Sequence, residues 1–402
     1  MIKIQINNLQ QKKQEYLNAV LEKVAYRLSI LQKSLFHLNG DAIDYSNGDL
    51  VSFRAITRDI ISLVGDDIKI PNGQIGYTNA ITNYRANANN LGNINLQGLI
   101  AFCHDMLANN KTQLSELLIC EANGLMNLNQ NILNTYVLNT NSNIGIIKLA
   151  FDYQRFSDDI SSFIRAYFRV NEFVKVCPYC NKKEALYETN DYNEAVESYH
   201  LDHFYDKATF PLLSYCLFNL VPSDNTCNVT NKGTTKFTAI HHLNPHEQGY
   251  DDKIKFTPIG ITPSNEVLTI EVEILERQGT ALYTKINGNN PPNLEQTNLG
   301  NLNVFKIRSK YKAEKIKAGQ ILELVKSNDK NIRHIKKFLQ SLKGLNKELT
   351  YIDWYKKKIN SSYYPETFNE SSYSKFCRDI HDYYYSKNET SFNRYIVELI
   401  NQ

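Results

Sequence analysis

A helical spacing of apolar residues dominates the first part of the chain. From Gln10 to Leu38, apolar side chains such as Val20, Val24 and Leu28 recur every three or four positions, which is the stripe that an amphipathic helix buries. The same spacing returns over residues 52–64, 96–107, 112–138 and 144–170. Asparagine-rich stretches separate several of these segments and are typical of loops. We therefore predict a helical domain over residues 1–170, used as a scaffold or as a surface that docks a partner.

The pattern changes at about residue 171. Cysteine, histidine and turn-forming residues concentrate between Cys177 and His246, where we expect short strands and loops with one helix. Residues 253–262, 266–275 and 281–288 then alternate apolar and polar positions, which predicts a small antiparallel sheet. Helical spacing returns from Val304. The pattern predicts an α+β fold in three parts: the helical domain over 1–170, a core over 171–250, and a region over 251–402 with the sheet followed by helices.

Composition and charge narrow the function only slightly. A net charge of +3 over 402 residues permits a nucleic-acid partner without requiring one. No apolar run approaches the ~20 residues that span a bilayer, and the first residues lack the apolar core of a signal peptide. The seven cysteines are mostly far apart, unlike a disulfide framework. We expect a cytoplasmic protein, neither secreted nor attached to a membrane, in which a close cysteine pair serves metal or redox chemistry.

The close pair is Cys177 and Cys180, in the stretch VCPYC. A redox dithiol needs a helix that begins at the pair, but turn-forming residues follow Cys180 and no continuous apolar stripe does. A structural zinc site needs more ligands within a few tens of residues, and Cys227, with Asp224 three positions before it, supplies them at the same spacing. We expect structural Zn²⁺ on Cys177, Cys180, Asp224 and Cys227, with His200 or Cys216 as alternative fourth ligands; a buried Cys227 beside an empty site is the remaining possibility.

The segment between these cysteines carries a further set of residues in a fixed order. They are Asp202-His203, Asn219-Leu220, Cys227-Asn228 and Lys232-Gly233. This order and spacing resemble the HNH endonuclease family, also called the ββα-metal nucleases, over about Phe173 to Gly249. The stretches LDHFYDK, FNLVPS and NPHEQGYDD are similar to HNH subunits of bacterial anti-phage systems of the Septu kind. Two positions depart from that pattern, because Asp206 stands in place of a proline and Asp224 in place of a cysteine.

The resemblance implies a ββα-metal nuclease core between the helical domain and the C-terminal region. His203 is then the general base, since an imidazole accepts a proton at neutral pH. Asp202 and Asn228 bind catalytic Mg²⁺ or Mn²⁺ through hard oxygens. Asn219 is a further catalytic-site residue that holds the loop and orients His203, and Lys232 is a candidate nucleic-acid contact. Because neighbouring residues on a strand point to opposite faces, we expect the strand to end or bend at Asp202-His203.

The expected function is that of a metal-dependent endonuclease that hydrolyses the phosphodiester bonds of DNA, as the effector of an anti-phage defence system. The chain contains no GxxxxGK[ST] motif for binding nucleoside triphosphates, and the resemblance implies a separate ATPase subunit as partner. Two alternatives stay open. One is an HNH nuclease that cleaves RNA such as tRNA, and the other is a non-catalytic, zinc-stabilised module that binds nucleic acid or protein.

Overall fold

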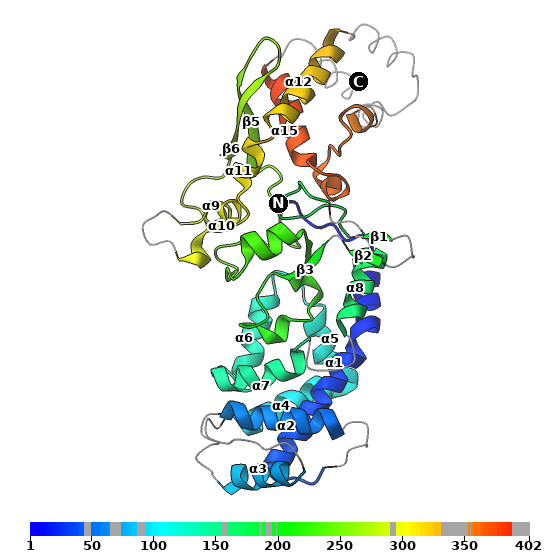
Figure 1. Cartoon of the computed structure of the whole chain (residues 1–402), viewed down its shortest axis with the longest axis vertical. Coiled ribbons are helices and arrows are strands. Elements are labelled where there is room, and N and C mark those ends of the chain that lie inside the picture. The colour runs from blue at the N-terminus through cyan, green and yellow to red at the C-terminus, as the bar shows by residue number, and fades with distance from the viewer. Residues whose placement is uncertain are drawn as a thin grey trace. The chain divides into compact units, whose positions relative to one another are not determined.

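Helices and three two-stranded sheets make up the described part of the computed structural model, which is α+β as the sequence predicts (Figure 1). Contacts divide the chain into two units, and neither is continuous in sequence. The helical unit consists of Ile6–Asn171 and His203–Leu220; the mixed unit consists of Met1–Gln5, Glu172–Asp202 and Val221–Gln402. The structure describes residues 1–43, 50–64, 74–86, 94–153, 160–171, 173–184, 187–189, 195–197, 199–289, 295–330, 353 and 355–387.

The long helix α1 (Leu9–Asn39) organises the helical unit. Its apolar stripe is fully buried, as at Val20, Val24 and Leu28, and it packs against α2, α4, α7 and α8 (Figure 1). Gly40 ends the helix with a φ of 98°, a conformation that glycine adopts without a steric penalty. The other elements of this unit are α2 (Leu50–Val64), α3 (Gln74–Ala86), α4 (Leu96–Leu107), η2 (Asn109–Lys111), α5 (Thr112–Leu118), α6 (Leu125–Thr135), α7 (Asn141–Phe151) and α8 (Ile160–Asn171).

The helical spacing over residues 112–138 corresponds to two helices. Helix α5 ends at Leu118 and α6 begins at Leu125. Between them, the amide of Gly124 donates to the carbonyl of Glu121 at 2.9 Å, which closes a turn. The apolar positions are buried on both sides of this break, so periodicity identified the buried face but not the interruption.

The segment His203–Leu220 belongs to the helical unit although the sequence division assigned it to the core over 171–250. It contains two short helical turns, η3 (Pro211–Leu213) and η4 (Leu217–Asn219). The hydroxyl of Tyr16 on α1 donates to the carbonyl of Tyr215 at 2.7 Å. The thiol of Cys216 donates to the carbonyl of Leu117 at 3.0 Å. These buried contacts explain why this stretch packs with the helices.

An antiparallel hairpin of β5 (Ile254–Ile261) and β6 (Val267–Ile274) confirms two of the three strands expected in the mixed unit. The third expected strand is wrong, because residues 281–287 form helix α9 (Ala281–Asn287). The side chain of Thr280 accepts a hydrogen bond from the amide of Tyr283 and so caps the helix. Gly288 ends it with a φ of 83°. The capping residues at both ends favour a helix, and eight residues of alternating pattern were too few to indicate a strand.

The remaining strands and helices belong to the mixed unit, except that the last residue of β3 and the first residue of β4 belong to the helical unit. Strands β3 (His200–His203) and β4 (Leu220–Ser223) pair, and η5 (Thr226–Lys232), wound as a π-helix, follows them. The others are β1 (Tyr187–Thr189), β2 (Ala195–Glu197), η6 (Gln296–Asn298), α10 (Gly300–Val304), α11 (Ile307–Lys312), α12 (Lys315–Lys330), η7 (Pro365–Glu370) and α15 (Ser374–Lys387).

The first residues of the chain are fastened into the mixed unit. The amide of Ile2 donates to the carbonyl of Pro178 at 2.7 Å, and that of Ile4 donates to Pro245 at 2.8 Å. Ile2 also packs in a buried cluster with Val176 and Phe368. The turn that carries Cys177 and Cys180 therefore contacts residues near the start of the chain, such as Ile2, and residues near its end, such as Phe368. No helix in the described ranges has the length and hydropathy that crossing a membrane requires.

Candidate metal centre and candidate catalytic residues

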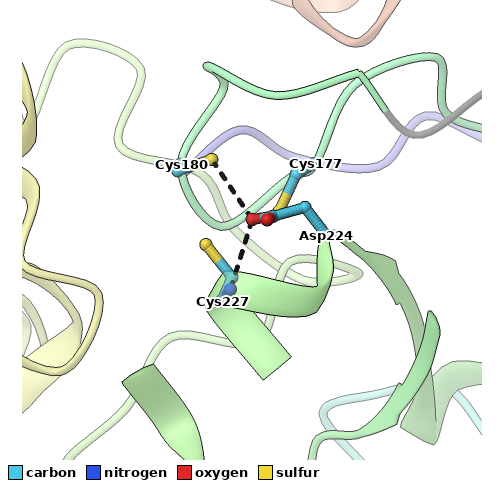
Figure 2. Close-up of side chains that lie close together, drawn as sticks. All are labelled: Cys177, Cys180, Asp224 and Cys227. Carbon is cyan, nitrogen blue, oxygen red and sulfur yellow. Dashed lines mark hydrogen bonds between the residues drawn. The ribbon is translucent and has the colours of Figure 1, made fainter. Parts of the chain in front are cut away.

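Four ligand atoms meet in the mixed unit where the sequence predicts a metal. The sulfurs of Cys177, Cys180 and Cys227 and a carboxylate oxygen of Asp224 lie within 4.8 Å of one another, and all four residues are buried (Figure 2). Two sulfurs that bind one tetrahedral zinc at ~2.3 Å are ~3.8 Å apart. The group therefore has the donor types and the size of a metal site, and it could hold one ion.

The turn that presents Cys177 and Cys180 is tight. The amide of Cys177 donates to the carbonyl of Lys183 at 2.8 Å, and the amide of Asn181 donates to the carbonyl of Cys177 at 2.8 Å. Asn181 has a φ of 51°, which asparagine tolerates better than most residues. No helix begins within residues 176–184, so the context that a redox dithiol requires is missing there. The metal interpretation of VCPYC is the one that this geometry favours.

Asp224 occupies the fourth position of the group. Its Oδ1 accepts a hydrogen bond from the amide of Thr226 at 2.9 Å, and its Oδ2 accepts one from the amide of Cys227 at 3.2 Å. The carboxylate thus satisfies free amides at the start of η5. Its Oδ2 also lies 4.0 Å from the sulfur of Cys180 (Figure 2). The two alternative ligands lie elsewhere, since His200 is exposed on β3 and Cys216 is in the helical unit.

The three thiols of the group do not ionise alike. Hydrogen bonds from Cys177 and Cys227 hold the pKa of Cys180 well below its usual value. Burial raises the pKa of Cys177, and hydrogen bonds with Cys177 and Cys180 raise that of Cys227. The ammonium of Lys310 on α11 lies 3.2 Å from the sulfur of Cys227. Burial lowers the pKa of Lys310, but its electrostatic interactions with Cys227 and Cys180 raise that pKa overall. A dication bound to the group would favour ionisation of the thiols.

His203 has its partners in the helical unit. Its Nε2 lies 3.0 Å from the carbonyl oxygen of Ser214, and because a carbonyl only accepts, the ring nitrogen is the donor. The hydroxyl of Tyr153 donates to the same carbonyl at 2.9 Å. The Tyr153 ring also meets the His203 ring edge to face, with centroids 5.5 Å apart. The imidazole is therefore fixed both by a hydrogen bond and by an aromatic contact.

Asn219 is fully buried and binds the backbone of the loop before it. Its Oδ1 accepts from the amide of Tyr205 at 2.7 Å. Its Nδ2 donates to the carbonyls of Tyr205 and Leu213, at 3.0 and 2.9 Å. The backbone carbonyl of Asn219 accepts from the amide of Phe204, next to His203, at 2.8 Å. These contacts are of the loop-holding kind that the sequence predicts for this residue.

Asp202 is buried and already has a cationic partner. The ammonium of Lys232 lies 2.8 Å from Oδ1 and 2.9 Å from Oδ2 of Asp202. The hydroxyl of Tyr179, between the two cysteines of VCPYC, donates to Oδ2 at 2.6 Å. Only 4% of Lys232 is exposed. This lysine therefore lies inside the protein on the predicted metal ligand, and not at the exposed position from which a phosphate contact is usually made.

Asn228 lies on η5, four residues before Lys232. Lys232, whose ammonium contacts Asp202, is the last residue of the same π-helix. Its side chain is half-buried. Carboxylate and amide oxygens are the donors that Mg²⁺ prefers. Asp202 and Asn228 carry such oxygens, and their role as ligands of a catalytic ion stays a prediction.

The predicted catalytic residues are divided between the two units. His203 and Asn219 belong to the helical unit, whereas Asp202, Asn228 and Lys232 belong to the mixed unit. The peptide bond between Asp202 and His203 is itself the boundary. Strand β3 ends at His203, in agreement with the expectation that the strand ends or bends at Asp202-His203. The hydrogen-bond partner of the His203 side chain is in the helical unit, and the partners of the Asp202 side chain are in the mixed unit.

Several important neighbours were not predicted from the sequence. Tyr179 lies between Cys177 and Cys180 in VCPYC, so the sequence placed an aromatic residue beside the predicted metal ligands but did not indicate its contact with Asp202. Tyr153 and Ser214 carry no motif that links them to His203. Lys310 is one of several lysines in a basic segment, 83 residues from Cys227, and only the fold distinguishes it from the others.

Comparison with known proteins gave no match to a family, to a curated protein or to a solved structure. The resemblance to HNH nucleases therefore depends on the motif residues of the sequence alone.

Proposed function

We propose that this protein is a metal-dependent HNH endonuclease that hydrolyses the phosphodiester bonds of DNA. The observation that carries the proposal is the order of elements β3, β4 and η5. Asp202-His203 ends the first strand, Leu220 begins the second directly after Asn219, and Asn228 lies on the helix. The cysteine group at the start of η5 supports the proposal further, because zinc clamps often flank the motif in the family that this segment resembles.

His203 is the proposed general base. With Nε2 donating to the carbonyl of Ser214, the lone pair of the neutral imidazole is on Nδ1. That nitrogen accepts the proton of the water that attacks phosphorus. The carbonyl of Ser214 then stabilises the imidazolium that results, as an oriented acceptor does in other hydrolases. Asn219 contributes by keeping the loop that carries Ser214 in shape.

Asp202 and Asn228 are the proposed ligands of Mg²⁺ or Mn²⁺. When bound, such an ion neutralises the negative charge that develops on the phosphate oxygens. We assign Zn²⁺ to Cys177, Cys180, Asp224 and Cys227, where it would join the VCPYC turn to η5. The two ions then have separate roles, one in chemistry and the other in holding the fold.

The proposed setting is anti-phage defence with a separate ATPase subunit. Support comes from the Septu-like stretches and from the lack of a nucleoside-triphosphate motif in the sequence. The helical unit is the candidate docking surface. Co-purification with an ATPase encoded beside the gene is the expected result, and a chain that cuts DNA freely without any stable partner would contradict this setting.

The decisive experiment is plasmid cleavage in Mg²⁺ by the wild type, by His203→Ala and by the control His200→Ala. His200 is exposed on the same strand, three residues earlier, so its removal leaves cleavage unchanged. Loss of the base is expected to lower the rate about 100-fold or more. Undiminished cleavage by His203→Ala ends the mechanism. Cleavage of RNA but not plasmid identifies an RNA nuclease, and binding without turnover in any metal identifies a non-catalytic module.

A further inference from the structure

The carboxylate of Asp202 has both oxygens engaged by groups of the protein itself. Lys232 lies within hydrogen-bonding distance of both oxygens, at 2.8 and 2.9 Å, and Tyr179 adds a hydrogen bond at 2.6 Å. These are the oxygens that the proposed function assigns to a divalent ion. A bound ion and the ammonium would therefore compete for the same two atoms.

The surroundings of this ion pair are largely aromatic. The ammonium of Lys232 lies 4.8 Å from the ring centroid of Phe237. The ring of Tyr179 stacks on Phe305 with centroids 4.2 Å apart. In such surroundings a carboxylate without a counter-charge is strongly destabilised. Asp202 therefore needs a cation at all times, whether this is the ammonium or a metal.

Simultaneous binding of both cations is unfavourable. A dication at Asp202 would lie within a few ångströms of the ammonium in a region of low effective dielectric, where like charges repel strongly. Lys232 is the last residue of η5, and Gly233 follows it with a φ of 48°. The lysine side chain is long and flexible, so the ammonium can leave the carboxylate without unwinding the helix.

We propose that Lys232 is the resting counter-cation of Asp202, and that a divalent ion binds Asp202 only by displacing it. The inference rests on the proposed function in one respect, the assignment of Asp202 as a metal ligand. The lysine then sets the affinity for the catalytic ion and keeps the site closed to metal at low concentration. Removal of its charge should strengthen metal binding, whereas removal of an ordinary phosphate contact should leave metal binding unchanged.

The test is Mn²⁺ binding, measured by calorimetry on the full chain without nucleic acid. Lys232→Met keeps most of the side-chain length and removes the charge, and the exposed Lys236→Met is the matched control. We expect Lys232→Met to bind Mn²⁺ at least about 10-fold more tightly than the wild type, and Lys236→Met to match the wild type. Affinity of Lys232→Met that is equal to or weaker than that of the wild type overturns the proposal.

Thermal unfolding provides a second measurement in case the single variant folds poorly. Without metal, Lys232→Met should melt below the wild type, and saturating Mn²⁺ should raise its melting temperature more than that of the wild type. The double variant Lys232→Met, Asp202→Asn removes both charges and should not respond to Mn²⁺. If saturating Mn²⁺ fails to recover Lys232→Met, the metal cannot replace the ammonium and the proposal is wrong.

The wild type offers a measurement that needs no variant. With ¹⁵N-labelled lysine side chains, the buried ammonium should give a slowly exchanging signal in metal-free protein, and Mg²⁺ should abolish that signal. A signal that persists at saturating Mg²⁺ overturns the proposal. Failure here and failure of the nuclease proposal are distinguishable. A chain that binds Mn²⁺ through Asp202 but cuts nothing refutes only the nuclease, whereas Asp202→Asn with wild-type Mn²⁺ affinity refutes the ligand assignment itself.

Discussion

The carbonyl oxygen of Ser214 accepts two hydrogen bonds, one from His203 and one from Tyr153. Burial raises the pKa of Tyr153 well above its usual value, so its hydroxyl remains a donor at any working pH. Under the proposed function Tyr153 is a positioning residue, because it contacts the imidazole through this shared acceptor and through its ring. Tyr153→Phe removes a hydrogen bond of about 1 kcal/mol, and we expect kcat to fall ~5-fold while KM stays unchanged.

Steady-state cleavage of a short duplex separates these two constants. A role confined to stability would appear as a lower melting temperature with normal kcat for the folded fraction. Equal kcat in Tyr153→Phe and the wild type would show that the aromatic contact alone fixes His203. Loss of substrate affinity without loss of kcat would instead place Tyr153 on the path of the nucleic acid.

Single residues could be predicted where their chemistry is local. Asn219 is an amide whose side chain binds the backbone of its own loop, and the sequence predicted contacts of this kind; that it orients His203 for catalysis stays a prediction. The burial of Lys232 could not be predicted, because its partner lies 30 residues earlier. A lysine beside a glycine usually lies at the surface, and only the pairing of β3 and β4 with η5 after them brings it to Asp202. Charge pairs that depend on such tertiary proximity carry no pattern in the sequence.

Helix α12 lies very close to the turn between β5 and β6, and a glycine makes this approach possible. A Cβ on Gly319 would be 2.7 Å from the backbone carbonyl oxygen of Asn265, so either the helix or the turn would have to move. Overpacking of this kind costs about 1–3 kcal/mol. We expect Gly319→Ala to lower the free energy of unfolding by that amount, as measured by urea denaturation.

Gly145 on α7 provides the control of opposite sign. A Cβ at Gly145 would meet only the side chain of Leu63, at 3.6 Å, which is an ordinary contact. Alanine in a helix interior is favoured over glycine by about 0.5–1 kcal/mol, so Gly145→Ala should stabilise the protein. If Gly319→Ala and Gly145→Ala change the free energy of unfolding in the same direction, the close approach of α12 to the hairpin does not explain the effect of Gly319→Ala.

Helices and strands could be predicted where the hydrophobic pattern is long, and the prediction failed where that pattern is short. Helix α1 repeats its apolar spacing over many turns, and β5 and β6 alternate over eight residues each. Residues 281–288 also alternate, yet Leu282 and Ile286 share a helical face, and Thr280 and Gly288 provide the two ends. Over eight residues both periods fit, so the capping residues were the better evidence.

The discontinuous division of the chain into two units could not be predicted from the hydrophobic pattern, although one of its boundaries lies where that pattern changes. A boundary at about residue 171 agrees with the change in hydrophobic pattern, and the structure changes unit between Asn171 and Glu172. The return of His203–Leu220 to the helical unit depends on contacts with residues far away in sequence, such as Tyr16. The placement of Met1–Gln5 in the mixed unit likewise depends on backbone hydrogen bonds to Pro178 and Pro245.

The cysteine group connects distant parts of the mixed unit, and this leads to a prediction for the whole molecule. Cys177 and Cys180 are in the turn that binds Ile2, and Cys227 lies in the first turn of η5. Tyr311 on α11 donates to the carbonyl of Cys180 at 2.8 Å. Under the proposed zinc assignment, removal of the ion would leave three buried thiols without the bonds that join these segments. We expect a strong chelator to release one zinc per chain, measured by elemental analysis. Amide hydrogen exchange should then become at least about 10-fold faster over residues 173–184 and 226–232.

Two cysteine variants make this prediction specific to the group. Cys177→Ser replaces a thiolate ligand with a hydroxyl that binds zinc poorly, so the purified protein should lack zinc and show fast exchange without any chelator. Cys120→Ser, at a half-buried cysteine of the helical unit, should retain zinc and slow exchange. The exchange of α1 should stay the same throughout, because its buried stripe packs on other helices of its own unit. If chelation leaves residues 173–184 as protected as before, the four ligands pack as an ordinary buried cluster and the fold does not need an ion.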